Sequence, residues 1–324
     1  MSIHAERFLD SPIVHQQMCE SLGNNINGPT IIRVPEWIEK PLGRYYLYFA
    51  HHEGQHIRMA FSNSIAGPWT IHKPGVLHLK QSLFPFDPAS IQVSMENADP
   101  LSLFGVQDHR PHIASPDVLI DDAKQRVLLY FHGMIENGDQ KTRLAASENG
   151  LDFAPLPDLF DHYYYRVFEY CDTYWAISWG GYVFKAQSPE GPFERVTSPF
   201  ECAPVCSSSH VIRHVAVFRT GNRLLLFFSR IGDCPERILY CDVQLMPNIE
   251  DWHVSEPREL LTPVDDWEGA DLPIAPSQAG AVYNAVHALR DPHVFKDTDG
   301  RVYLSYCGAG EHAIGIVELK GIVS

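Results

Sequence analysis

Short runs of apolar and aromatic residues, separated by Gly, Pro, Asn and Asp, follow one another along nearly the whole chain. Two examples are GRYYLYFAHH from residue 43 and GNRLLLFFSR from residue 221. Runs of this length, bounded by turn residues, are typical of β-strands. The 3.6-residue periodicity of amphipathic helices is nearly absent. The pattern therefore predicts an all-β protein with one short helix over Ile13 to Leu22, between Pro12 and Gly23.

The strand runs form a repeating unit of three phrases: an opening strand, a turn with an aromatic-rich strand, and a third strand that often ends in a Gly-Pro-aromatic turn. Five copies occupy residues 28–69, 115–153, 165–193, 213–243 and 291–319. Repeats of this kind predict a five-bladed β-propeller whose opening strands line a central channel. A two-sheet sandwich is the competing fold, but it does not explain five phased copies.

The repeat also sets the domain organisation. We expect an N-terminal segment with a short helix over residues 1–26 and a single catalytic propeller domain over residues 27–324. One blade should be closed by a strand from the N-terminal segment or from residues 70–80. The long segments 76–111 and 244–290 join one copy to the next, so they should gather over one face of the disc.

Composition narrows the class of protein. The chain has 324 residues, of which 45% are hydrophobic, so it can bury a core and is not intrinsically disordered. Its 25 basic and 40 acidic residues give a net charge of −15, which argues against nucleic-acid and membrane-surface partners. No secretory signal and no CxxC pair is visible among seven cysteines, which favours reduced thiols and a cytoplasmic location.

The last copy carries the motif Asp291-Pro292-His293-Val294-Phe295, preceded by Arg290. This text resembles the five-bladed propeller glycosidases, the families around arabinanases, xylosidases and invertases that include glycoside hydrolase families 43, 117 and 32–68. The resemblance covers roughly residues 27–320 and implies a glycosidase of carbohydrate metabolism, with a carboxylate at the head of an inner strand. The first copy departs from the family, because Asn27-Gly28-Pro29 carries no acid there.

Glycoside hydrolysis needs two carboxyl groups that flank the bond. Asp291 opens the fifth copy, and Asp117 follows Ser115 at the same place in the second copy, so we expect the two aspartates to face one pocket. Glu311 follows a Gly-rich turn and Glu268 follows a tryptophan, and either is a candidate proton donor. Each of the four acids is equally explained as an ordinary turn or loop residue.

Other polar and aromatic residues near the predicted channel are candidates for substrate binding. They are His51, His112, Arg166, Trp179, Arg230 and Arg290. Guanidinium groups recognise carboxylates and phosphates, although Arg230 with Asp233 or Glu236 would equally form a salt-bridged loop. His214 and His293 are the candidates for a structural metal ion near the axis; no cofactor is otherwise implied.

These features favour a glycoside hydrolase that cleaves a small oligosaccharide or a terminal sugar with carboxylates in the central cavity. The arginines favour, as an alternative, a glycoside phosphorylase on the same fold. The missing acid beside Pro29 favours a carbohydrate-binding propeller without turnover.

Overall fold

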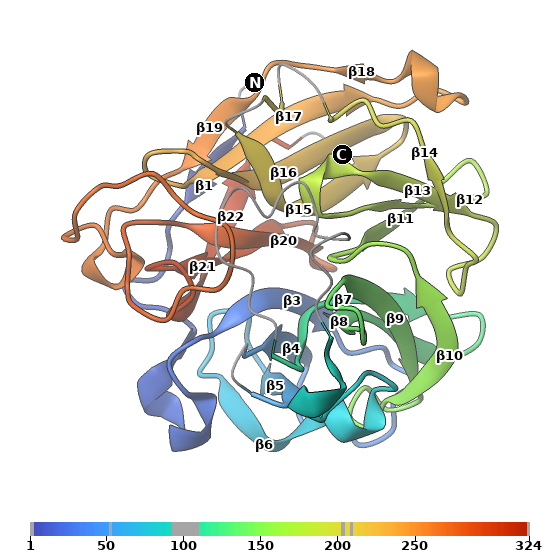
Figure 1. The fold of residues 1–324 in the computed structure, drawn as a ribbon. Helices are drawn as coiled ribbons and strands as arrows, with labels where there is room; N and C mark the ends of the chain where they lie inside the picture. The colour runs from blue at the N-terminus through green and yellow to red at the C-terminus, as the bar shows by residue number, and fades with distance from the viewer. Residues whose placement is uncertain (1–2, 52–53, 93–109, 202–204, 208–209, 323–324) are drawn as a thin grey trace.

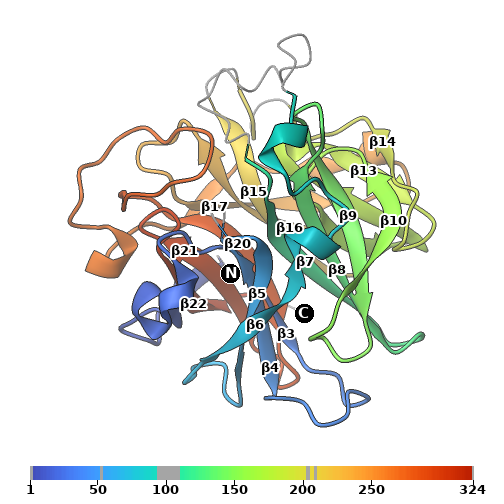
Figure 2. The ribbon, with the colours of Figure 1, turned by 60° about the horizontal axis from the view of Figure 1, so that its bottom comes forward.

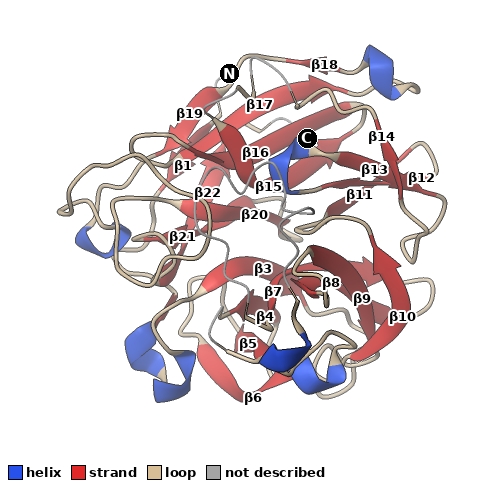
Figure 3. Cartoon of the chain, viewed as in Figure 1, coloured by secondary structure: helices blue, strands red, loops and turns tan. Residues whose placement is uncertain are grey.

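Five antiparallel sheets stand around a common axis and form a five-bladed β-propeller, as predicted (Figure 1). The structure is a computed structural model that describes residues 3–51, 54–92, 110–201, 205–207 and 210–322. Strands dominate the cartoon and the helices are short 3-10 turns (Figure 3). None of the helices in the described ranges is long and apolar enough to cross a membrane.

Each blade runs from an inner strand at the axis to an outer strand at the rim. Blade one contains β3 (Asn27–Arg33), β4 (Tyr45–Ala50), β5 (His56–Ser62) and β6 (Thr70–His78). Blade two contains β7 (Ile113–Asp121), β8 (Arg126–Met134), β9 (Gln140–Ser147) and β10 (Ala154–Phe160). Blade three contains β11 (Arg166–Tyr170), β12 (Thr173–Ile177), β13 (Val183–Ala186) and β14 (Glu194–Val196).

Blade four contains β15 (Val211–Thr220), β16 (Arg223–Ile231), β17 (Ile238–Gln244), β18 (His253–Val254) and β19 (Arg258–Leu261). Blade five contains β20 (Arg290–Lys296), β21 (Val302–Gly308) and β22 (Ala313–Lys320). The 3-10 helices outside the N-terminal segment are η3 (Leu79–Gln81), η4 (Pro88–Ser90), η7 (Trp179–Gly181), η8 (Ile249–Asp251) and η9 (Asp266–Glu268). Strands β18 and β19 show that the first part of the segment expected as one long insertion over 244–290, as far as Leu261, in fact completes blade four.

The N-terminal segment closes the ring. Strand β1 (His4–Glu6) pairs antiparallel with β22 and forms the outer strand of blade five, and β2 (Val14–His15) pairs with the other end of β22.

The helix predicted over Ile13 to Leu22, between Pro12 and Gly23, is wrong. Val14 is buried in the sheet, and the rest of the segment forms two 3-10 turns, η1 (Gln16–Met18) and η2 (Glu20–Leu22). Pairing with β22 overrides the local helix signals.

The core is divided among the five interfaces between neighbouring blades, each of which has its own cluster of buried hydrophobic residues. Strand β16 shows why. Side chains alternate across a strand, so Leu224, Leu226 and Phe228 pack toward blade three while Leu225 and Phe227 pack toward blade five. A blade strand is buried on both faces, which explains why the sequence reads as continuous apolar runs.

The inner strands contact one another in the order β3, β7, β11, β15, β20 and back to β3. Four of them carry a register shift near their first residues: between Asn27 and Thr30, Ala114 and Asp117, Ile212 and Val215, and Arg290 and His293. A bulge of this kind adds unpaired residues to a strand and redirects their side chains. The residues within the shifts are therefore the ones that can face the axis.

The second long connection, residues 262–289, projects as an extended loop from one side of the ring of blades (Figure 2). The guanidinium of Arg110, at the end of the first connection, donates a hydrogen bond to the Tyr283 hydroxyl, and its centre lies 5.5 Å from that ring. Most of the first connection, residues 93–109, lies outside the described residues. The second connection, residues 262–289, is described throughout and forms a wall beside the axis.

Candidate active site

One residue from each blade contributes to a closed ring at the axis, which we call the axial ring: Gly28, Ser115, Tyr164, His214 and Asp291. The Gly28 amide donates to Oδ2 of Asp291 at 3.0 Å. Asp291 Oδ1 contacts the imidazole Nδ1 of His214, and that imidazole lies edge-on to the Tyr164 ring at 4.2 Å. The Tyr164 hydroxyl lies next to Ser115, and Ser115 packs against Gly28.

The backbone of the ring residues is unusual. Gly28, Ser115, Tyr164 and Asp291 all have positive φ angles, between 45° and 61°. Residues other than glycine adopt this left-handed region at a cost in free energy, and clusters of such residues are typical of functional sites. In blades one, two and five the residue that follows is proline, which fixes the direction of the inner strand as it leaves the axis.

The Asp291 carboxylate is fully buried and bound on both oxygens. Burial alone would raise the pKa of Asp291, but the adjacent His214 imidazole and the Gly28 amide outweigh it, and the pKa lies below its usual range. The negative charge of Glu311 acts in the opposite direction, which shows that the two carboxyl groups influence each other. Asp291 is therefore an ionised carboxylate at neutral pH.

His214 is buried, and its two ring nitrogens have different environments. Nδ1 faces the ionised Asp291, so it carries the proton. Nε2 is buried, and no hydrogen-bond partner for it exists within the described part of the chain. The neighbouring Tyr164 has a pKa raised by burial and by the charges of Asp291 and Glu311, so its hydroxyl is protonated.

Blade one has no room for the carboxylate that the family resemblance places there. A Cβ atom at Gly28 would lie 2.8 Å from Cα of Ser115, and φ at this position is +60°. A side chain at residue 28 would therefore displace the backbone of blade two. The only carboxylate in the axial ring comes from blade five.

A network of buried charges lies behind the axial ring. Glu236 accepts a hydrogen bond from Nε of Arg213 at 2.7 Å and pairs with Nε of Arg290 at 2.9 Å. Arg290 Nη1 then donates to Oε1 of Glu311 at 3.3 Å, and the Asn25 amide donates to Oε2 of Glu311. Two arginines and two glutamates alternate, so their charges balance, which is what makes burial of all four possible.

The structure brings some of the predicted site residues together and separates others. Asp291, Glu311, Arg290 and His214 share the axial region. Asp117 lies instead between blades two and three, where it accepts a hydrogen bond from the Val167 amide at 3.0 Å. The bulge at Ser115 breaks the two-residue alternation, so Ser115 and Asp117 do not face the same way. The partners of Asp291 are instead the Gly28 amide and His214.

Arg166 and His293 also connect blades. Arg166 donates to the carbonyl oxygens of Pro116 in blade two and Val215 in blade four. His293 occupies in blade five the place of Asp117 in blade two, and its Nδ1 accepts from the Ile31 amide while Nε2 contacts the Thr30 hydroxyl. Across the described ranges, no group of three or more His, Cys, Asp or Glu is placed to hold a metal ion.

Glu268 is fully buried within the second connection. Its carboxylate accepts hydrogen bonds from Arg7, from the Tyr306 hydroxyl and from the amides of Val264 and Asp265. None of these partners belongs to the axial ring. The side chain acts as an anchor for the N-terminal segment, and the tryptophan before it packs against Gly308 and Gly315.

The remaining predicted binding residues lie at varied positions. Arg230 pairs with Asp233 at 3.0 Å, which confirms the salt-bridged loop as the arrangement at this turn. His112 donates through Nδ1 to the Arg110 carbonyl at 2.7 Å. Trp179 stacks on Tyr163 at 5.3 Å, and His51 is buried against Gly23 and Gly54.

Sequence reasoning missed Arg213, Glu236 and Asn25 as members of the site. A signal existed for one of them. Arg213-His214 stands at the start of blade four as Arg290-Asp291 stands at the start of blade five, so aligning the opening phrases identifies Arg213. Glu236 and Asn25 lie in connecting turns without a recurring pattern.

No family model matches the chain. The chain is 31% identical over 329 residues to the uncharacterized protein R118 of Acanthamoeba polyphaga mimivirus, an alignment that covers 95% of this chain and 88% of the viral protein.

Solved structures with this fold include a thermostable family-43 glycoside hydrolase, with 14% identity, a TM-score of 0.56, and coverage of 93% of this chain and 95% of that one. A second is a family-43 β-xylosidase/α-arabinofuranosidase from a compost microbial metagenome in complex with xylotriose, with 13% identity, a TM-score of 0.58, and coverage of 97% and 94%. A third is a family-43 enzyme from Xanthomonas citri complexed with xylose, with 13% identity, a TM-score of 0.57, and coverage of 95% and 88%.

Proposed function

Because the chain belongs to the same family as the mimivirus protein R118 and shares the fold of the family-43 glycoside hydrolases, we propose that it is a glycoside hydrolase acting on a small oligosaccharide or a terminal sugar. The observation that supports this most directly is the pair of acids at the axis. Asp291 and Glu311 come from one blade, influence each other electrostatically, and are each held by groups from other segments. A pair of positioned carboxyl groups is the usual equipment of glycoside hydrolases.

The contacts suggest a division of roles. Both oxygens of Asp291 are occupied, so this carboxylate orients the His214 imidazole. Nε2 of His214 is then the atom that exchanges a proton with the substrate oxygen or the attacking water. Glu311 supplies the second negative charge, which stabilises the positive charge that develops on the sugar ring during bond cleavage. In this proposal Asp117 and Glu268 hold the fold together.

The test is turnover of defined glycosides by the purified full chain. Xylosides, arabinofuranosides and their short oligosaccharides come first, because two structural neighbours were crystallised with xylose or xylotriose. Released sugar is measured for the wild type, Asp291→Asn and Glu311→Gln. Asp299→Asn is the matched control, because Asp299 is an exposed residue of the turn between β20 and β21 and pairs with Arg301. Loss of turnover in the two axial variants alone supports the proposal; full turnover in both contradicts it.

Two features favour a second candidate, a carbohydrate-binding propeller without turnover. Asp291 is fully buried, and blade one has no space for its own carboxylate. The same panel separates the candidates, because binding without release of sugar by any substrate identifies the binding protein. Adding inorganic phosphate to each assay tests phosphorolysis, which would release a sugar phosphate in place of the free sugar.

A further inference from the structure

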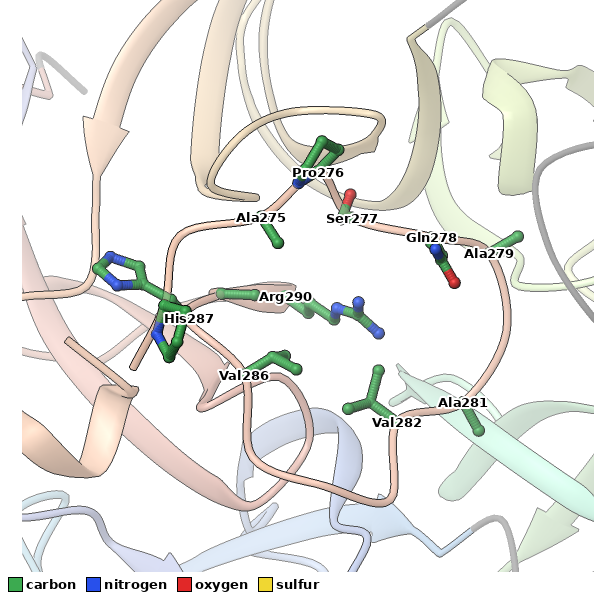
Figure 4. Close-up of a pocket in the computed structure, with 12 residues that line it drawn as sticks. Ala275, Pro276, Ser277, Gln278, Ala279, Ala281, Val282, Val286, His287 and Arg290 are labelled. Atoms are coloured by element: carbon green, nitrogen blue, oxygen red, sulfur yellow. The ribbon is translucent and has the colours of Figure 1, made fainter. Parts of the chain in front are cut away.

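A cavity lies beside the axial ring, under the second connection (Figure 4). Its volume is about 300 Å³. We call it the loop pocket. Its lining residues are Pro273, Ala275, Pro276, Ser277, Gln278, Ala279, Ala281, Val282, Val286, His287, Ala288 and Arg290. The Arg290 side chain extends across its floor, and the Gln278 amide points into it from the loop (Figure 4).

The wall of the loop pocket is held in place by the charged network. Arg213 donates to the carbonyl oxygens of Gln278 and Gly280. The Val282 amide donates to Glu311 and the Val282 carbonyl accepts from Asn25 at 2.8 Å. The loop is thus held at several points of its backbone, and a cavity of about 300 Å³ lies beneath it among the residues that the structure describes. A cavity with a fixed wall is pre-formed for a ligand, which lowers the entropic cost of binding.

The charges around Arg290 indicate the kind of ligand. Its Nε and Nη1 pair with Glu236 and Glu311, and Nη2 has no hydrogen-bond partner among the residues that the structure describes. Nη2 can therefore donate to an acceptor in the pocket. The positive charge is already matched by the two glutamates, so a second anion would add repulsion without a free counter-charge. A neutral acceptor fits better than a carboxylate or a phosphate.

The second polar group supports the same conclusion. The Gln278 amide carries both an acceptor oxygen and a donor nitrogen, and it faces the guanidinium donor across the pocket (Figure 4). Hydroxyl groups both donate and accept, so a polyhydroxylated ligand can satisfy both sides. The aliphatic surface of Pro276, Val282 and Val286 suits the C–H face of a ring. The volume lies at the lower end for ligand sites, which limits the ligand to about one ring.

From these observations we propose that the loop pocket binds one neutral sugar ring, next to but separate from the axial ring. The choice of a sugar rests on the proposed function. Because Arg290 touches the pocket and also holds Glu311, a bound sugar contacts the same guanidinium that positions an axial carboxylate. Occupancy of the pocket would then influence the axial site through one side chain.

The pocket is tested by binding, independently of turnover. The probes are the neutral sugars xylose, arabinose and glucose, and the acidic sugar glucuronate, which differs from glucose by its carboxylate. Methyl-labelled valines report location: Val282 and Val286 line the pocket, while Val127 lies in the core of blades one and two. We expect a neutral sugar to shift the Val282 and Val286 methyl signals and to leave Val127 unchanged, and glucuronate to bind at least tenfold more weakly than glucose.

Variants then assign the binding to the pocket walls. Ala275→Leu fills the space from the side that Figure 4 shows facing inward, and Gln278→Leu removes the facing amide. Both positions are exposed in the free protein, so the fold should survive. Ala285→Leu, on the same loop but outside the lining, is the matched control. We expect the first two variants to weaken binding at least tenfold and the control to bind like the wild type.

Each other outcome has a defined meaning. Tighter binding of glucuronate than of glucose overturns the neutral-ligand assignment. Absence of any shift at Val282 and Val286, or binding that Ala275→Leu and Gln278→Leu leave unchanged, overturns the site. Binding with these signatures in a wild type that hydrolyses no glycoside leaves the pocket standing and removes the proposed hydrolase activity, so the two failures are distinguishable.

Discussion

Nδ1 of His214 contacts Oδ1 of Asp291, and this contact joins the fourth blade to the fifth at the propeller axis. The other oxygen of Asp291 receives the Gly28 amide from blade one. One carboxylate therefore connects three blades. It contacts Nδ1 of the imidazole, so Nε2 is the nitrogen to which the proposed function assigns proton exchange.

His214→Gln should lower turnover of a cleaved glycoside by about 10²–10⁴-fold, the usual contribution of a positioned acid–base group. Added imidazole should restore part of the activity of His214→Ala. Because the imidazole lowers the pKa of Asp291, its removal should raise that pKa, which carboxyl NMR measures. The exposed His253→Gln is the control. Wild-type activity in His214→Gln contradicts the proposed role.

Gly28→Ala should destabilise the protein by about 2–5 kcal/mol. Roughly 1–2 kcal/mol comes from the left-handed backbone and roughly 1–3 from the clash with Ser115. Gly221 is a matched control, since its φ is +58° and nothing lies within 4 Å of an added Cβ. Gly221→Ala should therefore show the backbone effect alone. Urea unfolding of both variants measures the difference in the free energy of unfolding. Equal decreases in the two variants would show that the backbone near Ser115 moves to accommodate the added Cβ atom.

His293 should make the protein less stable as the pH falls. Burial and the nearby Arg166 lower its pKa from 6.5 to about 3. Between these values the unfolded chain binds a proton that the folded chain does not, so stability declines as the pH drops from 6.5 toward 3. His293→Gln keeps an acceptor for the Ile31 amide and a donor for Thr30, and should flatten this slope by up to one proton. The measurement is the free energy of unfolding of the wild type, His293→Gln and the control His253→Gln from pH 4 to 7. A slope in His293→Gln equal to that of the wild type would contradict the prediction.

Arg7→Ala should loosen the closure of blade five. Glu268 is fully buried, and loss of its guanidinium partner leaves a buried carboxylate underpaired, at a cost of about 3–5 kcal/mol. Amides of residues 4–6 and 318–320 should then exchange with solvent faster than those of blades two and three. Arg301→Ala breaks the exposed pair with Asp299 in the turn between β20 and β21 and should cost under about 1 kcal/mol. Unchanged hydrogen exchange at β1 would show that Arg7 does not stabilise the pairing of β1 with β22.

The number of blades could be predicted because the central strands of each blade are buried on both faces and therefore appear in the sequence as continuous apolar runs. Leu224 to Phe228 alternate between two neighbouring cores, so the run is apolar throughout, and five such runs mark five blades. Among the fourth strands, only residues 70–80, where β6 lies, were considered as a strand from the sequence, because the fourth strands lie at the rim. Half or more of β6 and β10 is exposed or partly exposed, and their sequences carry no sustained apolar pattern.

The candidate site was only partly predictable. Asp291, Glu311 and Arg290 were expected near the axis, and they lie there. Asp117 was expected beside Asp291, but that expectation assumed an unbroken alternation along β7. The bulge at Ser115 inserts one extra residue into β7 and directs Asp117 toward the Val167 amide instead. Glu236 joins the network through tertiary packing alone, and nothing in its surrounding sequence distinguishes it from a surface acid.

The pairing of β1 with β22 has a consequence for protein synthesis. Residues 4–6 leave the ribosome early, yet their partners at positions 318–320 are made more than three hundred residues later. Until then, the lateral surfaces of the first and fourth blades that should meet the fifth remain uncovered, and the nascent chain exposes two unmated apolar sides. A ribosome stalled before residue 290 should therefore carry an aggregation-prone fragment of four blades, and its exposed apolar surface should bind chaperones.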